Sequence, residues 1–165
     1  MAKRGPGIRS VCIVPANYRD ASYVAANMRY EDRREFDALV DMHEPAAVAC
    51  DLVYRSEGLA YCAVIGDQPV AVYGVCPILP HLWSAWAYGT DRLKRAIPAI
   101  TRHAVEVTKP ALIERQIARL QVHTLIDHDL SHSWLEGLGA RCEGVARSYG
   151  RHGEDFKMYA WTGKD

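Results

Sequence analysis

The sequence predicts a single α/β domain, built on a mixed, mostly antiparallel central sheet that is flanked by helices on both faces. Short β-rich runs alternate with segments in which apolar residues recur at helical spacing. Two of the runs lie close together in the middle of the chain, whereas later runs are separated by helical segments, which indicates a hairpin followed by crossovers. A chain of 165 residues that is 49% hydrophobic can form one sizeable core. We therefore expect one domain over residues 11–165, preceded by a flexible basic tail over residues 1–10.

The first half of this domain is expected to begin with a strand over residues 11–15, a short apolar run. Two helices should follow, because Asp20 and Asp32 each have a side chain suited to capping a helix that begins there. A third helix is predicted from Pro45, which suits a first helical position, to a point near Gly58. Three helical segments thus separate the first strand from the rest of the sheet.

A hairpin is predicted next, since the β-rich runs 59–65 and 69–75 flank a short turn at residues 66–68. A further strand over residues 82–88 is aromatic and β-prone. These strands should form the antiparallel middle of the sheet.

The second half contains a long helical pattern that two prolines interrupt. Proline lacks a backbone donor and clashes with the preceding turn, so the regular helix is predicted to begin near Pro98 and to break near Pro110. A strand over 119–126 and a helix over 129–138, ended by Gly139, should follow. The last two strands are predicted at residues 141–145 and 156–161.

Charge and cysteine usage exclude several classes of protein. Twenty basic residues balance twenty acidic residues, which predicts no nucleic-acid partner and no anionic membrane partner. No apolar run approaches the length of a membrane span and no signal-peptide core is visible, so we expect a soluble protein that is not secreted. The five cysteines form no C-x-x-C pair, and the apolar neighbours of four of them favour buried free thiols over disulfides or a zinc site.

Several local motifs, in their order and spacing, resemble a known superfamily. Residues 68–75 resemble the hairpin of this superfamily, and residues 134–140 resemble the segment that leads from its last helix to its last strand. Residues 86–91 (Trp-Ala-Tyr-Gly-Thr-Asp) are similar to a Trp-x-x-Gly-Thr-Asp signature of one narrower group within it, and residues 27–29 with 32–35 resemble the opening helices of that same group. The chain from about Val11 is thereby similar to the GNAT (N-acetyltransferase) superfamily, and more narrowly to acetyltransferase-like proteins of the head and internal-virion gene regions of tailed bacteriophages. The resemblance implies acetyl-CoA as cofactor and a location in the bacterial host cytoplasm or the virion.

The cofactor loop of this chain departs from the family pattern. The superfamily presents backbone N–H groups from a glycine-rich loop at the start of its central helix, where a pyrophosphate binds. Here the corresponding residues Gly89 and Thr90 precede Asp91, whose carboxylate is expected to cap the helix and repel phosphate. Positive charge beside the loop could come from Arg92, Lys94 and Arg95, although three cations beside a helix start are more often part of a solvated face.

Two further residues are predicted near the cofactor, Gly74 and Val75, in the strand that the resemblance places beside it. Gly74 is interpreted either as a bulge that parts two strands into a cleft for the pantetheine arm, or as a glycine required by close packing.

The catalytic residues are less well indicated. The family's general-acid tyrosine falls on Leu135, which has no proton to donate. His128 stands where the family commonly has asparagine, and it is interpreted either as an acid or base or as a partly exposed helix-start histidine. A general base could be Glu44 or Glu57, or a water held by backbone groups.

A metal site is not expected. His128 and His132 lie one helical turn apart and His123 precedes them, but no cysteine or glutamate completes a metal-binding signature.

Two functions remain open from the sequence. The first is an acetyl-CoA-dependent N-acetyltransferase with a degenerate cofactor loop, acting on an amine-bearing small molecule or a protein amino group. The alternative is a catalytically inactive GNAT-fold component of a tailed-phage virion, whose partners are other virion proteins. A host-directed anti-defence binder is compatible with the same resemblance but no residue points to it.

Overall fold

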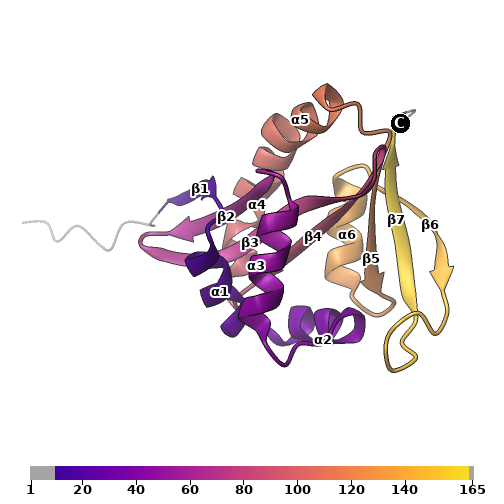
Figure 1. The fold of residues 1–165 in the computed structure, drawn as a ribbon, viewed down its shortest axis with the longest axis horizontal. Coiled ribbons are helices and arrows are strands. Elements are labelled where there is room, and N and C mark those ends of the chain that lie inside the picture. The colour runs from indigo at the N-terminus through magenta and orange to yellow at the C-terminus, as the bar shows by residue number, and fades with distance from the viewer. Residues whose placement is uncertain (1–9, 164–165) are drawn as a thin grey trace, which may run out of the picture.

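The computed structural model describes residues 10–163, so the predicted tail lies outside the described residues except for Ser10. Its centre is one seven-stranded sheet in the order β1-β2-β3-β4-β5-β7-β6 (Figure 1). Every neighbouring pair is antiparallel except β4 and β5, which run parallel. This confirms the predicted mixed, mostly antiparallel sheet. The strands are β1 (Val11–Pro15), β2 (Ala60–Ile65), β3 (Gln68–Leu79), β4 (Leu82–Gly89), β5 (Arg119–Leu125), β6 (Arg141–Ala146) and β7 (Phe156–Thr162).

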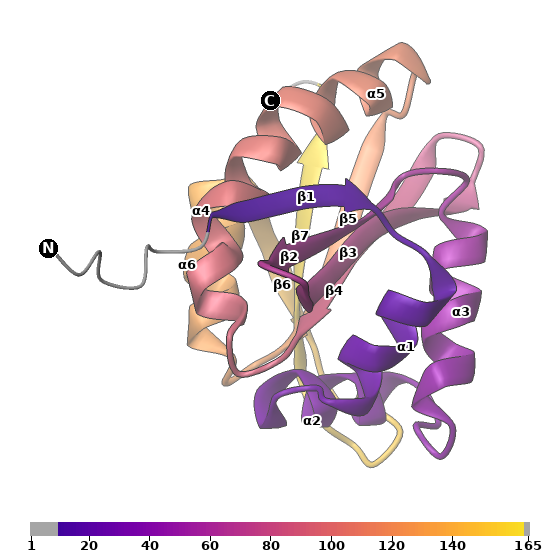
Figure 2. The same cartoon turned by 90° about the vertical axis from the view of Figure 1, so that its left-hand side faces the viewer.

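Helices cover both faces of this sheet (Figures 1 and 2). On one face α1 and α3 pack through Val24 and Ala49 onto Val72 and Tyr88. On the other face α4 packs onto β2 and β3, and α6 lies beside it. The helices are α1 (Tyr18–Ala26), α2 (Tyr30–Leu39), α3 (Pro45–Arg55), α4 (Leu93–His103), the π-helical η1 (Ala104–Thr108), α5 (Lys109–Glu114) and α6 (Asp129–Gly137).

The first two helices begin earlier than the sequence predicts. Asn17 caps α1 by accepting the backbone N–H of Asp20, which therefore lies inside the helix. Asp32 lies in the first turn of α2 and is only 4% exposed. Neither aspartate is the cap, and Asp32 has distant partners instead, which local pattern could not indicate.

The two prolines do not divide the central helix as predicted. Helix α4 begins at Leu93 and carries the exposed Pro98 in its interior. It then continues through η1, and Pro110 falls in the first turn of α5. Pro110 has no backbone N–H to donate, and it comes directly after the wider π turn, which ends with the hydrogen bond from the Lys109 N–H to the Ala104 carbonyl.

Strands β4 and β5 are neighbours only over a short stretch. Their pairing joins residues 82–84 to residues 119–121 and then ends. Figure 1 shows the two ribbons diverging below this shared start, β4 toward Gly89 and β5 toward Leu125. We call the opening between the diverging parts the fork.

Candidate functional site

A large cavity lies at the fork, on the face covered by α4 and α6. Its volume is about 610 Å³. Ala85 and Ala87 of β4 form one wall, and Leu120 and Val122 of β5 form another. Helix residues close it, including Ile100, Ala104, Leu112, Ser131, Trp134 and Leu135. This fork cavity is mainly apolar and its size suits an extended ligand arm.

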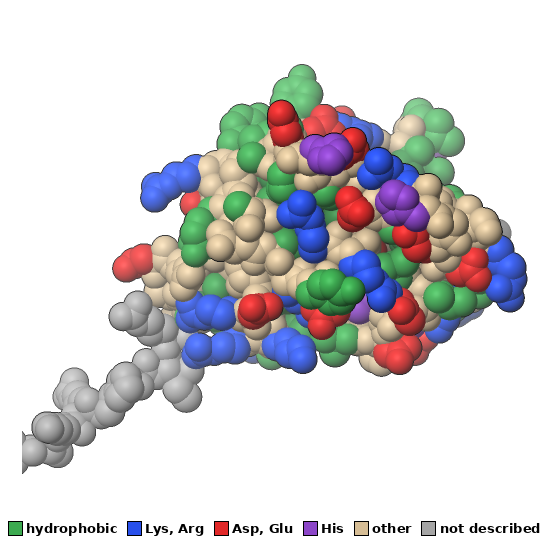
Figure 3. Space-filling model, turned by 90° about the horizontal axis from the view of Figure 1, so that it is seen from below, with side chains coloured by type: hydrophobic (Ala, Val, Ile, Leu, Met, Phe, Trp, Pro, Cys, Tyr) green, Lys and Arg blue, Asp and Glu red, His purple; other side chains and the backbone are tan. Residues whose placement is uncertain are grey.

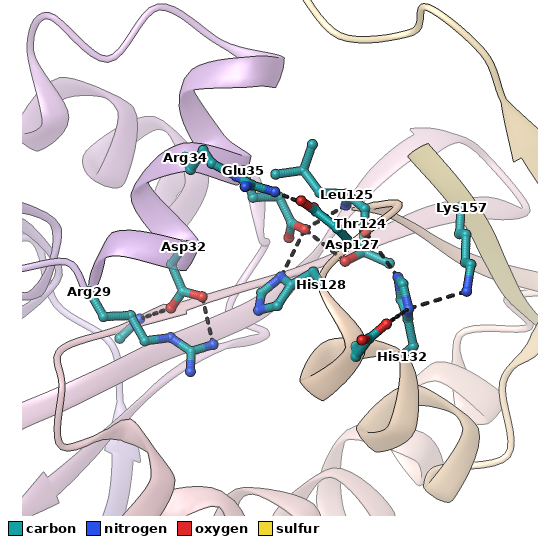
Figure 4. Close-up of polar contacts among 12 residues, drawn as sticks. Arg29, Asp32, Arg34, Glu35, Thr124, Leu125, Asp127, His128, His132 and Lys157 are labelled. Atoms are coloured by element: carbon teal, nitrogen blue, oxygen red, sulfur yellow. Dashed lines mark hydrogen bonds and ion pairs between the residues drawn. The ribbon is translucent and has the colours of Figure 1, made fainter. Parts of the chain in front are cut away.

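A polar cluster closes the far end of the fork, where β5 finishes. Glu35 of α2 accepts hydrogen bonds at Oε2 from the Thr124 hydroxyl at 2.7 Å and from the Leu125 backbone N–H at 2.8 Å. The same oxygen lies 3.0 Å from Nδ1 of His128 (Figure 4). The hydrogen bond with Glu35 raises the pKa of His128 above its ordinary value, against the opposing effect of burial.

A second cluster joins the same helix to the end of β4. Asp32 accepts two hydrogen bonds: its Oδ1 accepts one from the Arg29 guanidinium at 2.7 Å, and its Oδ2 accepts one from the Gly89 backbone N–H at 2.9 Å. The backbone N–H of Arg29 donates to the Gly89 carbonyl at 2.8 Å. Both backbone groups of Gly89 are therefore bound by α2 and the residue before it. Burial raises the pKa of Asp32, although Arg29 opposes that shift.

The two clusters face a second, smaller cavity of about 50 Å³, which we call the polar cavity. Arg29, Asp32, Glu35 and His128 all line it. It adjoins the fork cavity, because Glu35 and Ser131 line both. Among the side chains of residues 10–163, the buried nitrogen atoms without a hydrogen-bond partner are Nε of Arg29 and Nε2 of His128.

His128 is the predicted catalytic residue that the structure brings to this site. It is 8% exposed, so the expected partial exposure is wrong, although it does stand at a helix start, as the N-cap residue of α6. The residues that sequence analysis missed are Arg29, Asp32 and Glu35. A signal for two of them was present, since carboxylates three positions apart lie on one face of a helix.

Gly74 and Val75 line the fork cavity, but not as a bulge. Strand β3 keeps an unbroken register with both neighbours at Gly74, which pairs with Ala60 and Trp86. The packing interpretation fits instead, because an added Cβ would lie 2.7 Å from the Leu59 carbonyl oxygen and 2.8 Å from Cζ2 of Trp86. The cleft is formed by β4 and β5 and not by β3.

The start of α4 differs from the prediction at Asp91. Thr90 supplies the local contacts: its hydroxyl accepts the Arg92 N–H at 3.3 Å and its carbonyl accepts the Leu93 N–H at 2.9 Å. The N-cap residue is Arg92, so the expectation that the Asp91 carboxylate caps the helix is wrong. Gly89 and Thr90 lead into this turn.

The predicted cations at the start of α4 lie outside both cavities. Arg92 donates a hydrogen bond to the Gln68 side chain, which directs it toward β3. Lys94 and Arg95 are exposed on the first turn. They remain available to a charged group that approaches the helix start from solvent.

The other candidates for acid or base lie apart from the site or lack the chemistry. Glu44 is exposed at the start of α3, and that helix covers the opposite face of the sheet. Glu57 pairs with Arg115 at the surface. Leu135 lines the fork cavity and, as predicted, brings no proton donor to it.

Tyr73 of β3 lines both cavities and carries a phenol. Its hydroxyl lies 2.8 Å from Nδ1 of His103. Burial raises the pKa of Tyr73, so this hydroxyl stays protonated at neutral pH.

The three histidines weighed for a metal site have separate partners. His123 stacks on Tyr149, while Nε2 of His132 lies 2.9 Å from the Leu125 carbonyl and His128 binds Glu35. Over residues 10–163 no group of three or more His, Cys, Asp or Glu side chains could hold a metal ion. Within that same range no helix has both the length and the apolar character needed to span a membrane.

The surface at the end that carries α2 is mixed in charge. Figure 3 shows acidic and basic side chains interspersed over this end, with no single-sign stripe. Ion pairs tie α2 to neighbouring loops here, including Arg34 with Asp127 and, at 3.8 Å, His152 with Asp37. Helix α2 is thus held on its outer side as well as at the fork.

Comparison with solved structures identifies the fold. The ribosomal-protein-alanine N-acetyltransferase of Brucella melitensis has a TM-score of 0.71, with 16% identity over 92% of this chain and 99% of that one. Ard1 from Thermoplasma volcanium has a TM-score of 0.70, with 9% identity over 92% and 97%. A GNAT-family acetyltransferase from Bacillus anthracis has a TM-score of 0.69, with 12% identity over 94% and 96%. No protein-family model and no curated protein sequence matches the chain. The chain therefore has the GNAT fold, on structure alone.

Proposed function

We propose that this GNAT-fold chain is an acyltransferase that moves the acetyl group of acetyl-CoA onto an amine. The observation that carries the proposal is the fork, where β4 and β5 part beside an apolar cavity of about 610 Å³. The structural neighbours are named as acetyltransferases, which is consistent with this use of the fork.

The residues at the fork fit the arm of acetyl-CoA. Beyond Ser84, β4 has no strand partner on its β5 side, so backbone donors and acceptors along 85–88 remain for a ligand. The apolar walls at Ala87 and Val122 suit the methylene groups of a pantetheine arm. When bound there, acetyl-CoA supplies an activated thioester carbonyl.

The start of α4 is the proposed position for the phosphates. Lys94 and Arg95 are exposed on the first turn, where the helix dipole also favours an anion. The loop before it holds one glycine, Gly89, whose backbone groups are already bound by α2. We therefore expect weaker phosphate binding than a glycine-rich loop gives.

The engagement of Gly89 by α2 also favours a second candidate function, a GNAT-fold virion or assembly component without catalysis. In that case Asp32 occupies the backbone N–H at the end of β4, and the fork no longer binds acetyl-CoA. Its partners would be other phage proteins, as the sequence resemblance implies. Finding the chain at fixed copy number in purified particles by mass spectrometry would support it.

Acetyl-CoA titration tests the first candidate. We expect heat of binding in calorimetry and a raised melting temperature, since a ligand at 100 times its Kd stabilises a fold by about 2.7 kcal/mol. Absence of both at millimolar acetyl-CoA rejects the enzyme hypothesis.

A matched pair of variants locates the site. Ser131 lines both cavities, whereas Ser133 is exposed on the same helix. Ser131→Trp should abolish acetyl-CoA binding while Ser133→Trp retains it, with circular dichroism and urea unfolding confirming that both fold. Equal binding by the two variants would place the ligand elsewhere.

A further inference from the structure

We propose that His128 and Glu35 form the proton-accepting pair for the amine substrate, with Nε2 of His128 as the base and Glu35 as its positioning residue. This inference rests on the proposed function and names the catalytic group within it. Three features carry it: the fixed orientation of the imidazole, an unpartnered nitrogen at a cavity, and the surrounding charges.

The orientation comes from Glu35. Its Oε2 accepts hydrogen bonds from the Thr124 hydroxyl and the Leu125 backbone N–H. The same oxygen lies 3.0 Å from Nδ1 of His128. Because a carboxylate oxygen accepts, the proton of the neutral imidazole lies on Nδ1. The lone pair is then on Nε2, the form that a general base requires.

The unpartnered nitrogen belongs to a residue that lines the polar cavity. Nε2 of His128 is buried and has no hydrogen-bond partner, although buried polar atoms are nearly always satisfied. Figure 4 shows the imidazole between Glu35 and the Arg29–Asp32 pair, which line the same cavity. Since Glu35 and Ser131 line both cavities, the polar cavity that His128 lines adjoins the fork cavity.

The charges around the imidazole come from all the elements that face it. Glu35 and Asp32 on α2 favour its protonated form, and Asp127 beside it adds negative charge. Arg29 opposes protonation, and the nearby His132 has its own pKa lowered, mainly by burial. The net effect raises the pKa of His128, toward the range in which a base works at neutral pH.

The step balances without a further reactant. The amine nitrogen forms a bond to the thioester carbonyl carbon, and its proton moves to Nε2 of His128. The carbon–sulfur bond breaks, and the departing thiolate takes the proton back from Nε2. The pair ends in its starting state, with no change of oxidation state.

Imidazole nitrogen NMR on the intact protein tests the pair without any turnover. We expect His128 to carry its neutral proton on Nδ1 and to titrate above the ordinary 6.5. Glu35→Gln should lower that pKa, whereas Glu31→Gln, on the exposed side of α2, should leave it unchanged. Saturating acetyl-CoA should shift the Nε2 resonance. An Nε2–H tautomer, or a pKa at or below the ordinary value, overturns the inference.

Thiol release from acetyl-CoA measures the chemical step, with an alanine-leading peptide, a lysine peptide and spermidine as acceptors. His128→Gln should bind acetyl-CoA like wild type but lose about 100-fold or more in kcat. Glu35→Gln should lower kcat less and move the acid limb of the pH profile downward. His152→Gln, at an exposed histidine, is the control.

The two proposals fail differently. A wild-type chain that does not bind acetyl-CoA overturns the proposed function. Normal binding together with wild-type transfer by His128→Gln overturns only the assignment of the base. If none of the three amines is acetylated, the tautomer and pKa from NMR decide the inference.

Discussion

Asp32 and Glu35 lie one turn apart on α2, and their carboxylates accept backbone N–H groups from the ends of two different strands. Asp32 binds Gly89 of β4 at 2.9 Å and Glu35 binds Leu125 of β5 at 2.8 Å. These strands share no pairing beyond residues 82–84 and 119–121. A single helical turn therefore spans the open end of the fork and satisfies donors that the missing pairing leaves free.

Removing the Asp32 carboxylate should destabilise the fold strongly. Asp32→Ala leaves the buried Arg29 guanidinium and the Gly89 N–H without their acceptor, at a cost of about 3–5 kcal/mol. Urea unfolding measures this, with Glu31→Ala on the exposed side of the same helix as control. A loss below that of a typical surface substitution would show that the contact is not formed in solution.

Stability should depend on pH through His128. Its folded pKa is raised by Glu35, so the folded state holds this proton more tightly than the unfolded state does. The resulting stabilisation is complete below about pH 6.5 and is lost as pH rises through the folded pKa. The free energy of unfolding of wild type should therefore exceed that of Glu35→Gln by more at about pH 5.5 than at about pH 8.5. A difference that stays constant or grows with pH contradicts the pairing.

Gly74 should not tolerate a methyl group. In Gly74→Ala the new Cβ meets the Leu59 carbonyl oxygen and the Trp86 ring, so we expect a loss of about 1–3 kcal/mol. Gly137→Ala is the matched control, since an added Cβ there has open space and alanine favours the helix. Equal stability of the two variants would argue against the close approach of β2, β3 and β4 at this point.

Lys94 and Arg95 should matter for acetyl-CoA and not for the fold. Replacing both by alanine should raise the Kd for acetyl-CoA by about twofold to thirtyfold, at about 0.2–1 kcal/mol per exposed ion pair with a phosphate. Salt should weaken binding less in this variant than in wild type. Arg102→Ala, at the other end of α4, is the control. An unchanged Kd would mean that the phosphates lie elsewhere.

Pro98 should limit the stability of α4. Pro98→Ala restores an interior helical donor at an exposed position, and we expect a gain of about 1–2 kcal/mol after allowing for the more flexible unfolded chain. Pro110→Ala, in the first turn of α5, should change stability by less than about 0.5 kcal/mol. Thermal and urea unfolding compare the two, and a larger gain at Pro110 would contradict the helix boundaries.

Local pattern was sufficient for most of the elements. Two β-rich runs and the short turn at 66–68 predicted β2 and β3, and Gly139 ended α6 as expected. Pattern failed where a distant contact changes the role of a residue. Aspartate is a residue type that commonly caps helices, yet the buried Asp32 accepts the backbone N–H of Gly89 and so links α2 to β4.

The cysteines illustrate the same limit. Apolar neighbours predicted buried thiols, which is confirmed for Cys62 and Cys76. Cys12 also has apolar neighbours, yet it is exposed, because the outer strand β1 presents one face to solvent. Cys142 lies between Arg141 and Glu143, carried no such prediction, and is exposed as well. The residues adjacent to a cysteine in sequence do not indicate which face of its strand packs against the core.

The sequence by itself determined the order and type of the elements, and hence the mixed sheet, because hydrophobic periodicity and turn residues act over a few positions. It also supplied His128 as a candidate. Only the tertiary structure decided that His128 meets Glu35, which lies 93 positions away, and that their cavity adjoins the fork. Such contacts depend on how the helix α2 docks across two strands, and no local spacing encodes that distance.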